Sequence, residues 1–311
     1  MLALEGVWPF QRNAYAFSAD GSKLAYSRRS EYANFSIARV ATGGNVEHVI
    51  LTSGTAKKIC PALSPDGSLL AFLQDTQEGT ELFFVTTNGG IPERLTFGGS
   101  VAPVCPAWSP SGQRLAFATR LGGIRMLAMI ATRGGQPHVF ESTKVSDAMA
   151  WAPGRRIAYQ VPGNQNFRLL NPETEEDQLL VQSDSIGFVF SPKFSPDGTK
   201  VVVHWNLRRG RGLWLMSPAD GSHALLAEGR WIPIGWSGDG HSIYAADQGA
   251  FKRFSLVGGE GEIVSPPETV DGYCTPHERS EELVWVCKEG DSFSDVWMIE
   301  NFDPEMTGRS R

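Results

Sequence analysis

Short apolar runs recur along the chain, each directly after a polar turn that opens with an aromatic residue or a leucine. We call these turns signatures, and they lie at 17–21 (Phe-Ser-Ala-Asp-Gly), 63–67 (Leu-Ser-Pro-Asp-Gly), 108–112 (Trp-Ser-Pro-Ser-Gly), 151–154 (Trp-Ala-Pro-Gly), 194–198 (Phe-Ser-Pro-Asp-Gly) and 236–240 (Trp-Ser-Gly-Asp-Gly). A degraded seventh copy fits 277–282. The copies start 41 to 46 residues apart, and self-similarity at such a period indicates a repeat architecture.

Each signature is followed by runs with the length and composition of β-strands. A first run comes at once, as in 69–72 (Leu-Leu-Ala-Phe), and a second follows a polar loop, as in 81–85 (Glu-Leu-Phe-Phe-Val). A third run, such as 93–96, leads to the next signature. With the strand that enters the signature, four strands of about six residues and four turns of about five give a repeat of about 44 residues. The period therefore predicts four-stranded β-meanders.

The signature predicts the turn that closes the first hairpin of each repeat. Proline presets φ, aspartate caps the exposed amides, and glycine takes the positive φ that a tight turn needs. A meander cannot bury both faces alone, so the copies must stack, and radial stacking gives a β-propeller with signature aromatics between its blades. The core candidates are Phe17, Trp108, Trp151, Phe194 and Trp236.

Seven copies predict an all-β, seven-bladed β-propeller of four-stranded antiparallel blades, with six blades as the alternative if the last copy is irregular. The seventh copy ends near Phe302 without a fourth strand, and residues 2–8 precede the first signature. We therefore expect an N-terminal strand to close the last blade, which removes an exposed sheet edge. The propeller domain is expected to span 1–303, followed by a C-terminal tail, 304–311.

Composition and charge narrow the functional classes. Of 311 residues, 34 are glycine and 19 are proline, a count that fits many short strands. The formal net charge of −6 argues against nucleic acid as a partner, because phosphate backbones are bound by clustered Lys and Arg.

The chain shows no signal peptide and no run of about 18 apolar residues. We therefore expect no membrane insertion and a cytoplasmic location, with an extracytoplasmic one as the alternative if the chain comes from a membrane-anchored regulator. It is expected to be a monomer or a domain of a larger protein.

At its signatures the sequence resembles the WD-like repeats of TolB-type propellers, most closely at 63–72 and 194–203. The resemblance covers nearly the whole chain. Residues 294–303 resemble the last blade of the C-terminal sensor propellers of bacterial winged-helix regulators and serine/threonine kinases. The resemblance implies the fold, whereas the same scaffold hosts many functions.

No catalytic motif is present in the sequence. The nearest match to a G-x-S-x-G nucleophile elbow, 235–239 (Gly-Trp-Ser-Gly-Asp), fails at its last position and lies in a signature, so Ser237 is interpreted as a turn residue. The six histidines form no H-E-x-x-H pair. We expect a noncatalytic protein without a cofactor. The alternatives are a channel-centred, metal-dependent, lactonase-like hydrolase and an accessory propeller of a peptidase.

The four cysteines form no CxxC pair and are too few for a disulfide scaffold of this size, so free thiols are predicted. Cys60, Cys105 and Cys274 each lie three residues before the first position of their signature, which places them on innermost strands. We interpret them as small apolar residues near the channel. A metal or redox role is the alternative.

The loops that enter each repeat share a face with the loops between its second and third strands, and ligands of propellers usually bind there. The charges of these loops are of mixed sign, so a basic funnel is not predicted. Trp231 is the preferred contact residue, since aromatic residues are enriched at interface hot spots, and packing at a blade edge is its alternative role. A protein, peptide or small ligand is expected at this mouth, held by Arg12, Lys57, Lys58, Lys144, His204, Arg208, Arg230 and Trp231.

Overall fold

The computed structural model describes residues 15–17, 23–31, 34–40, 46–163, 166–181, 189–207, 210–247, 250–265, 273–279, 282–289 and 292–300. Within these ranges the extended regular elements are β-strands, and no helix there is long and apolar enough to cross a membrane. The chain divides into two compact units, one of residues 34–289 and one of residues 1–33 with 290–311.

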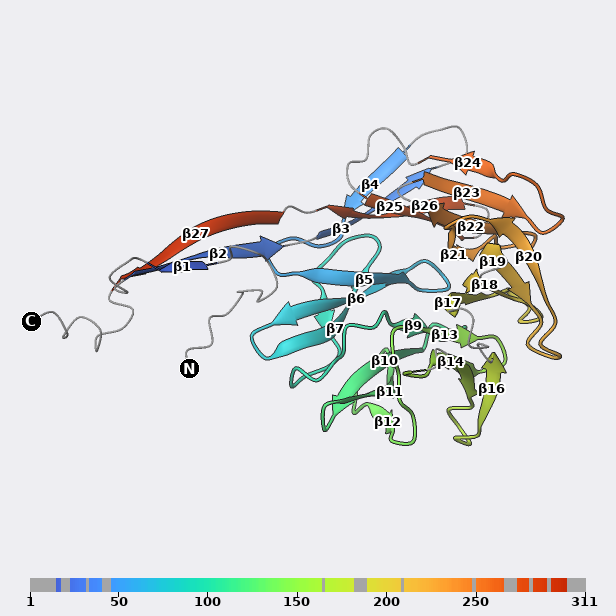
Figure 1. Ribbon diagram of the computed structural model, residues 1–311, viewed down its shortest axis with the longest axis horizontal. Coiled ribbons are helices and arrows are strands. Elements are labelled where there is room, and N and C mark those ends of the chain that lie inside the picture. Colours follow the sequence, from blue (N-terminus) through green and yellow to red (C-terminus); the bar gives the residue numbers. More distant parts are fainter. Residues whose placement is uncertain are drawn as a thin grey trace, which may run out of the picture. The chain divides into compact units, whose positions relative to one another are not determined.

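Residues 34–289 form six antiparallel sheets of four strands each, which we call blades 1 to 6 (Figure 1). Blade 1 contains β5 (Lys58–Leu63), β6 (Leu69–Thr76), β7 (Gly79–Thr86) and β8 (Glu93–Arg94). Blade 2 contains β9 (Ala107–Trp108), β10 (Arg114–Leu121), β11 (Ile124–Ala131) and β12 (His138–Phe140). Blade 3 contains β13 (Met149–Ala152), β14 (Arg156–Gln160), β15 (Phe167–Leu170) and β16 (Asp177–Val181).

The next two blades continue the same order along the chain. Blade 4 contains β17 (Val189–Phe194), β18 (Val201–Leu207), β19 (Gly210–Met216) and β20 (His223–Glu228). Blade 5 contains β21 (Ile232–Trp236), β22 (Ser242–Asp247), β23 (Ala250–Ser255) and β24 (Glu262–Val264). The first strands of successive blades contact one another, from β5 and β9 through to β21 and β25, and are therefore the innermost strands.

Blade 6 is assembled from both ends of the 34–289 unit, in the strand order β25-β26-β3-β4. It combines β25 (Tyr273–Arg279) and β26 (Glu282–Glu289) with β3 (Asn34–Val40) and β4 (Val46–Ile50) (Figure 1). In the β26–β3 ladder Leu283 opposes Val40 and Glu289 opposes Asn34. This pairing closes the ring of blades and leaves neither segment as a free edge.

The prediction of an all-β propeller with four-stranded antiparallel blades is confirmed, but the prediction of seven blades is wrong and the six-bladed alternative holds. The predicted closure by an N-terminal strand in the last blade is corrected, because β3 and β4 of the first repeat complete the seventh repeat instead. Residues 2–8 and the predicted tail lie outside the described residues. The predicted domain bounds, 1–303, stay a prediction.

The second unit contains a three-stranded antiparallel sheet in the order β1-β2-β27. Its strands are β1 (Tyr15–Phe17), β2 (Lys23–Glu31) and β27 (Ser292–Glu300). The first signature therefore connects β1 and β2, but its hairpin pairs with β27 rather than with β3. A repeat counted from its signature is thus split between two units, which accounts for the extra blade in the sequence count.

The signature turns fold as the sequence predicts. In blade 4 the Ser195 hydroxyl donates to Asp197 at 2.6 Å and accepts from the Lys200 amide at 3.0 Å, while the Gly198 amide bonds the Ser195 carbonyl. Asp197 also accepts from the Thr199 amide. The Ser195 hydroxyl, followed by the Thr199 amide and hydroxyl, lowers the pKa of Asp197 to about 2, because each bond favours the charged carboxylate.

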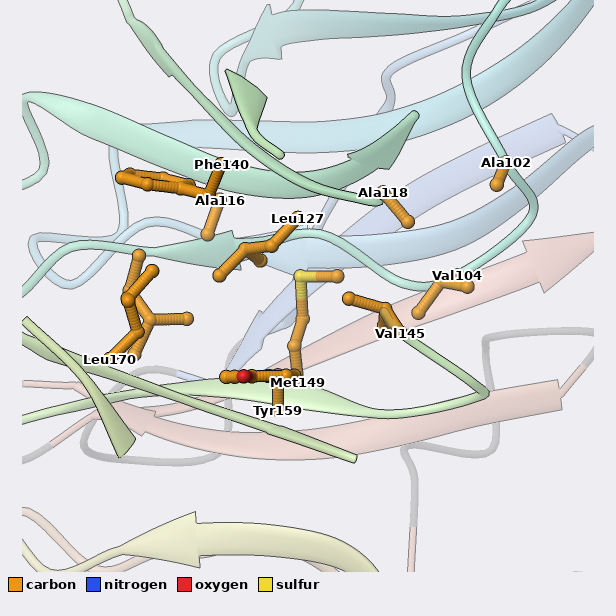
Figure 2. Close-up of a cluster of buried hydrophobic side chains, with 11 residues drawn as sticks. Ala102, Val104, Ala116, Ala118, Leu127, Phe140, Val145, Met149, Tyr159 and Leu170 are labelled. Atoms are coloured by element: carbon orange, nitrogen blue, oxygen red, sulfur yellow. The ribbon is translucent and has the colours of Figure 1, made fainter. Parts of the chain in front are cut away.

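Each interface between neighbouring blades is filled by buried apolar side chains. Figure 2 shows the cluster between blades 2 and 3, where Leu127 and Phe140 belong to blade 2 and Met149, Tyr159 and Leu170 to blade 3. The signature aromatics Trp108 and Trp236 are 8% exposed, as the wedge interpretation requires. Blade 6 contributes β3 and β26 side chains to the clusters that it shares with blades 1 and 5.

Two isoleucines of the closing segment test the ring closure. Ile37 of β3 is 1% exposed and packs in the cluster between blades 6 and 1, whereas Ile50 at the end of β4 is 66% exposed. We expect Ile37→Ala to lower the free energy of unfolding by about 2–5 kcal/mol, because it leaves a cavity. Ile50→Ala is expected to change it by less than about 0.5 kcal/mol. Urea unfolding measures both, and equal, small effects would show that β3 is not part of the core.

Candidate functional site

The loops that enter each blade and the turns between its second and third strands lie on one side of the ring, because the strands of each meander alternate in direction. We call this side the mouth face. Its described segments are 51–57, 95–106, 141–148, 229–231, 77–78, 122–123 and 161–163.

Lys58, one of the predicted contact residues, points into the protein. Its side chain is buried, and Nζ donates to Asn34 Oδ1 at 2.9 Å, to the Ser53 carbonyl at 3.0 Å and to the Ala56 carbonyl at 3.3 Å. All three acceptors are uncharged, and burial lowers the pKa of Lys58. The ammonium group therefore ties β3 to the loop that enters blade 1.

The structure brings His204, Arg230 and Trp231 together where blade 4 meets blade 5. His204 is 2% exposed, its Nδ1 lies 2.8 Å from the Trp231 carbonyl, and its Nε2 accepts from Arg211 Nε at 3.4 Å. Burial lowers the pKa of His204, which favours the neutral imidazole that these two bonds require. Arg230 is half-exposed and lies 3.6 Å from Asp247.

The Trp231 ring packs against blade 5 instead of standing free. It makes an edge contact with Phe254 at 5.3 Å between ring centroids, and Lys252 Nζ lies 5.4 Å from the indole. The ring lines a shallow pocket of about 360 Å³ that Glu260 also lines. This geometry corresponds to the blade-edge role that was the alternative for Trp231, and its role in binding stays a prediction.

Of the remaining predicted contact residues, the structure describes two, which lie in loops of different blades. Lys57 precedes Lys58 at the entry to blade 1, and Lys144 is exposed in the loop between blades 2 and 3. Arg12 and Arg208 lie outside the described residues. Binding by any of these residues stays a prediction.

An exposed aromatic residue on the mouth face escaped the sequence analysis. Phe97 follows β8 and is 71% exposed, with the Arg94 guanidinium 4.6 Å from its ring centroid. Arg94 is itself fixed by Glu78 at 2.5 Å and by the buried Glu81 at 2.8 Å. The sequence Thr-Phe-Gly-Gly at 96–99 marks an aromatic residue in a turn, which is the signal in the sequence for this residue.

The loop that carries Phe97 is held rigidly. Glu81 Oε1 accepts from the Gly99 amide at 2.6 Å, and Glu81 Oε2 accepts from the Thr96 hydroxyl. Gly99 has φ of +67°, and a Cβ placed there would overlap the Glu78 carbonyl, so only glycine permits this approach.

The same loop is bonded to blade 2 through Ser100, whose carbonyl accepts from the Arg120 amide at 2.7 Å. Leu121 and Ile124 flank the adjoining β10–β11 turn and are 49% and 44% exposed. Hydrogen bonds to two blades therefore hold the loop of Phe97 in place.

A lysine on an innermost strand was also missed. Lys193 of β17 is partly exposed, and the surrounding protein lowers its pKa by desolvation. Its carbonyl accepts the indole N–H of Trp236 at 2.8 Å. The equivalent positions before the other signatures hold small residues such as Ala62 and Ala107.

The prediction of free thiols is corrected by the structure. Cys60 of β5 and Cys105, just before β9, form a disulfide that joins the innermost parts of blades 1 and 2, with Cα atoms 4.8 Å apart. Cys287 is also disulfide-bonded, and Cys274 opposes it in the β25–β26 ladder. The interpretation of Cys60 and Cys105 as small apolar residues is wrong. The spacing of 45 residues equals the local period, so both cysteines occupy the same position in neighbouring blades.

The described residues contain no group of three or more His, Cys, Asp or Glu side chains that could hold a metal ion. The nearest arrangement of carboxylates, Glu78 and Glu81, is occupied by Arg94. The groups around Glu78 and Glu81 are therefore a cation, Arg94, and an apolar ring, Phe97.

The buried Lys58 predicts a pH dependence of stability. Its folded pKa is lowered from 10.5, so between the lowered value and 10.5 the unfolded chain binds more protons than the folded chain. The free energy of unfolding of the wild type relative to Lys58→Met should therefore rise as the pH increases from neutral towards 10.5. Lys57→Met, which removes the same charge at the neighbouring position, is the control. Parallel pH profiles of wild type and Lys58→Met in denaturant unfolding would refute the assignment.

Comparison with known proteins agrees with the geometry. Residues 6–175, more than half of the chain, match the family described as TolB beta propeller domain. No protein with a curated description matches the chain.

Among solved structures, the putative TolB from Agrobacterium tumefaciens has a TM-score of 0.59 at 17% identity, covering 87% of this chain and 99% of that one. TolB from Acinetobacter baumannii has a TM-score of 0.58 at 14% identity over 85% of this chain, which spans only 66% of that protein. An oligogalacturonate lyase in complex with manganese has a TM-score of 0.58 at 14% identity, covering 87% of each chain. The six closed blades, the Ser-Pro-Asp-Gly turns and the match over 6–175 lead to one conclusion, that the chain belongs to the TolB beta-propeller domain family.

Proposed function

We propose that the protein is a noncatalytic binding propeller, a sensor or scaffold, that recognises a protein or peptide through its mouth face. The observation that carries this proposal is Phe97, an aromatic side chain that is 71% exposed on a loop fixed at both ends. Exposing a large apolar side chain gives up its burial free energy, and fixing the loop costs conformational entropy. Both costs are offset when a partner covers the ring.

The surroundings of Phe97 have the composition of a protein interface. Arg94 lies over its ring, and Leu121 and Ile124 are exposed apolar side chains at the β10–β11 turn of the neighbouring blade 2. Aromatic residues and arginine dominate the binding free energy of interfaces, and a rigid frame reduces the entropy lost on association. Ile232, 39% exposed at the start of β21, is a further apolar residue on this face.

The alternative of a channel-centred hydrolase has less support. The lyase in complex with manganese shares the fold at 14% identity, which carries no information about the chemistry of this chain. The described residues offer no three-ligand cluster for a metal. A stoichiometric metal in the purified protein, together with a chelator-sensitive melting temperature, would favour the hydrolase.

The disulfides bear on the compartment. Bonds such as Cys60–Cys105 persist mainly in oxidising compartments. They favour the extracytoplasmic alternative over the cytoplasmic location expected from the sequence. Recovery of Cys60 and Cys105 as free, alkylatable thiols from rapidly quenched cells would contradict this assignment.

The test of the mouth face uses peptides selected from a random displayed library on the wild-type protein. We expect Phe97→Ala with Leu121→Ala to weaken the selected peptides about tenfold or more, because these side chains would form the centre of the interface. The matched control is Ile91→Ala with Val257→Ala, which removes two side chains, 90% and 95% exposed, from turns on the opposite side.

Calorimetric titration measures the dissociation constants, and melting temperatures confirm that both double variants fold. Peptides that bind both variants as tightly as the wild type, or that lose affinity only in the control variant, would contradict the proposal.

A further inference from the structure

On the side opposite the mouth face, the signature turns of neighbouring blades pack on each other. The glycine of one turn lies against the proline of the preceding turn at three described junctions: a Cβ added at Gly112, Gly198 or Gly240 would lie 3.9 Å from Pro65, 2.9 Å from Pro153 or 3.5 Å from Pro196. The close approach at Gly198 leaves no room for a side chain. These contacts cover the interfaces between blades at the end opposite the mouth face.

The junction between blades 2 and 3 lacks this contact. A Cβ added at Gly154 would have no atom within 4 Å. The glycine of the blade 3 turn therefore does not lie against Pro110, the proline of the preceding turn. The cause is a deletion in the signature of blade 3. Trp151 pairs with Ile157, six residues on, whereas Trp108 pairs with Leu115, seven residues on. The shorter turn also lacks the serine that is second in the signatures starting at 17, 63, 108, 194 and 236.

The missing contact leaves a pocket of about 290 Å³ between the two turns. Its walls include Pro110 and Arg114 from blade 2, Trp151 and Arg155 from blade 3, and Glu173 from the β15–β16 turn. This volume is at the lower end of the range for small-molecule sites, which is about 300–1,000 Å³.

The indole of Trp151 differs from its counterparts in the other blades. The indole N–H groups of Trp108 and Trp236 each donate to a carbonyl of the preceding innermost strand, those of Ala62 and Lys193, at 2.8 Å. Nε1 of Trp151 is buried and has no hydrogen-bond partner. This donor is closed off from solvent, so Trp151 contributes an apolar wall to the pocket.

Arg155 supplies an unpaired positive charge. It has φ of +67°, a conformation that glycine adopts readily and that costs free energy for arginine. Its guanidinium has no hydrogen bond or ion pair with the described residues, whereas the neighbouring Arg114 is paired with Glu173 at 2.5 Å. Strained non-glycine residues of this kind concentrate at binding sites.

We propose that this pocket binds the terminal carboxylate of a small ligand with an apolar part, such as a free N-acyl amino acid or the C-terminus of a peptide. The planar fork of Arg155 matches the two oxygens of a carboxylate. The apolar part of the ligand lies between the Trp151 indole and Pro110. Glu173 at the rim disfavours ligands with two or more negative charges. The site is separate from the mouth face and does not depend on the function proposed for that face.

The test titrates the full-length protein with N-benzoylglycine and with a pentapeptide that ends in a free glycine carboxylate, each beside its C-terminal amide. Ligand-observed NMR at millimolar concentrations measures binding. We expect binding of the carboxylates and a loss of at least tenfold for their amides. Binding of both carboxylates assigns a peptide C-terminus as a ligand, and binding of benzoylglycine alone assigns the free N-acyl amino acid.

Variants identify the groups in the pocket. Arg155→Gln should abolish binding, and Arg133→Gln, which removes the same charge from an exposed turn of blade 2, should leave it unchanged. Trp151→Leu removes the aromatic wall of the pocket and should weaken binding severalfold. Arg155→Gly should keep or raise the melting temperature while abolishing binding, because glycine accepts the positive φ. No binding of either carboxylate to the wild type, or equal binding by Arg155→Gln, would overturn the proposal.

Discussion

Ring closure through the β26–β3 ladder is the interaction on which the rest of the structure depends. A four-stranded blade has two apolar faces, and it buries them only between two neighbours. Blades 1 and 5 would each lose a neighbour without blade 6, and blade 6 exists only because residues 34–50 complete the sheet begun by residues 273–289. Trp285 and Ile37, from the two ends of this unit, are at most 1% exposed. Residues far apart in the sequence therefore share one core.

Within that ring the signature turn links local sequence to the contacts between blades. The serine and aspartate fix the hairpin, and the proline and glycine set the distance to the adjacent turn. Because this contact repeats around the ring, a deletion of one residue at a single copy has a local effect. At blade 3 the deletion separates Gly154 from Pro110, opens a pocket and leaves the Trp151 indole without an acceptor. Arg155, with its positive φ, lies in this shortened turn. The turn that departs from the repeat therefore also carries the positive charge of the pocket.

The signatures were sufficient to predict strands, turns and the propeller, because each is encoded within about ten residues by φ preferences and alternating apolar positions. The signatures did not predict the number of blades correctly. A signature marks a hairpin, but it does not determine which strand the hairpin pairs with. The hairpin of β1 and β2 has a signature but pairs with β27.

The side chains of the site were harder to predict than the strands. Lys58 and His204 have the charge and loop positions of surface residues, and only their acceptors in three dimensions show that they are buried. Phe97 was missed because exposure of an apolar residue depends on the frame provided by Glu81. The disulfide depends on the distance between two blades, which spacing along the chain does not determine.

The pairing of β3 with β26 is tested most directly by a crosslink between the two strands. Val40 and Leu283 are opposed in this ladder, and paired residues of antiparallel strands lie within reach of a disulfide. In a Val40→Cys/Leu283→Cys variant, oxidation followed by mass spectrometry of unreduced peptides should recover residues 40 and 283 joined in high yield. Recovery of both as free thiols in a folded protein would contradict the closure described here.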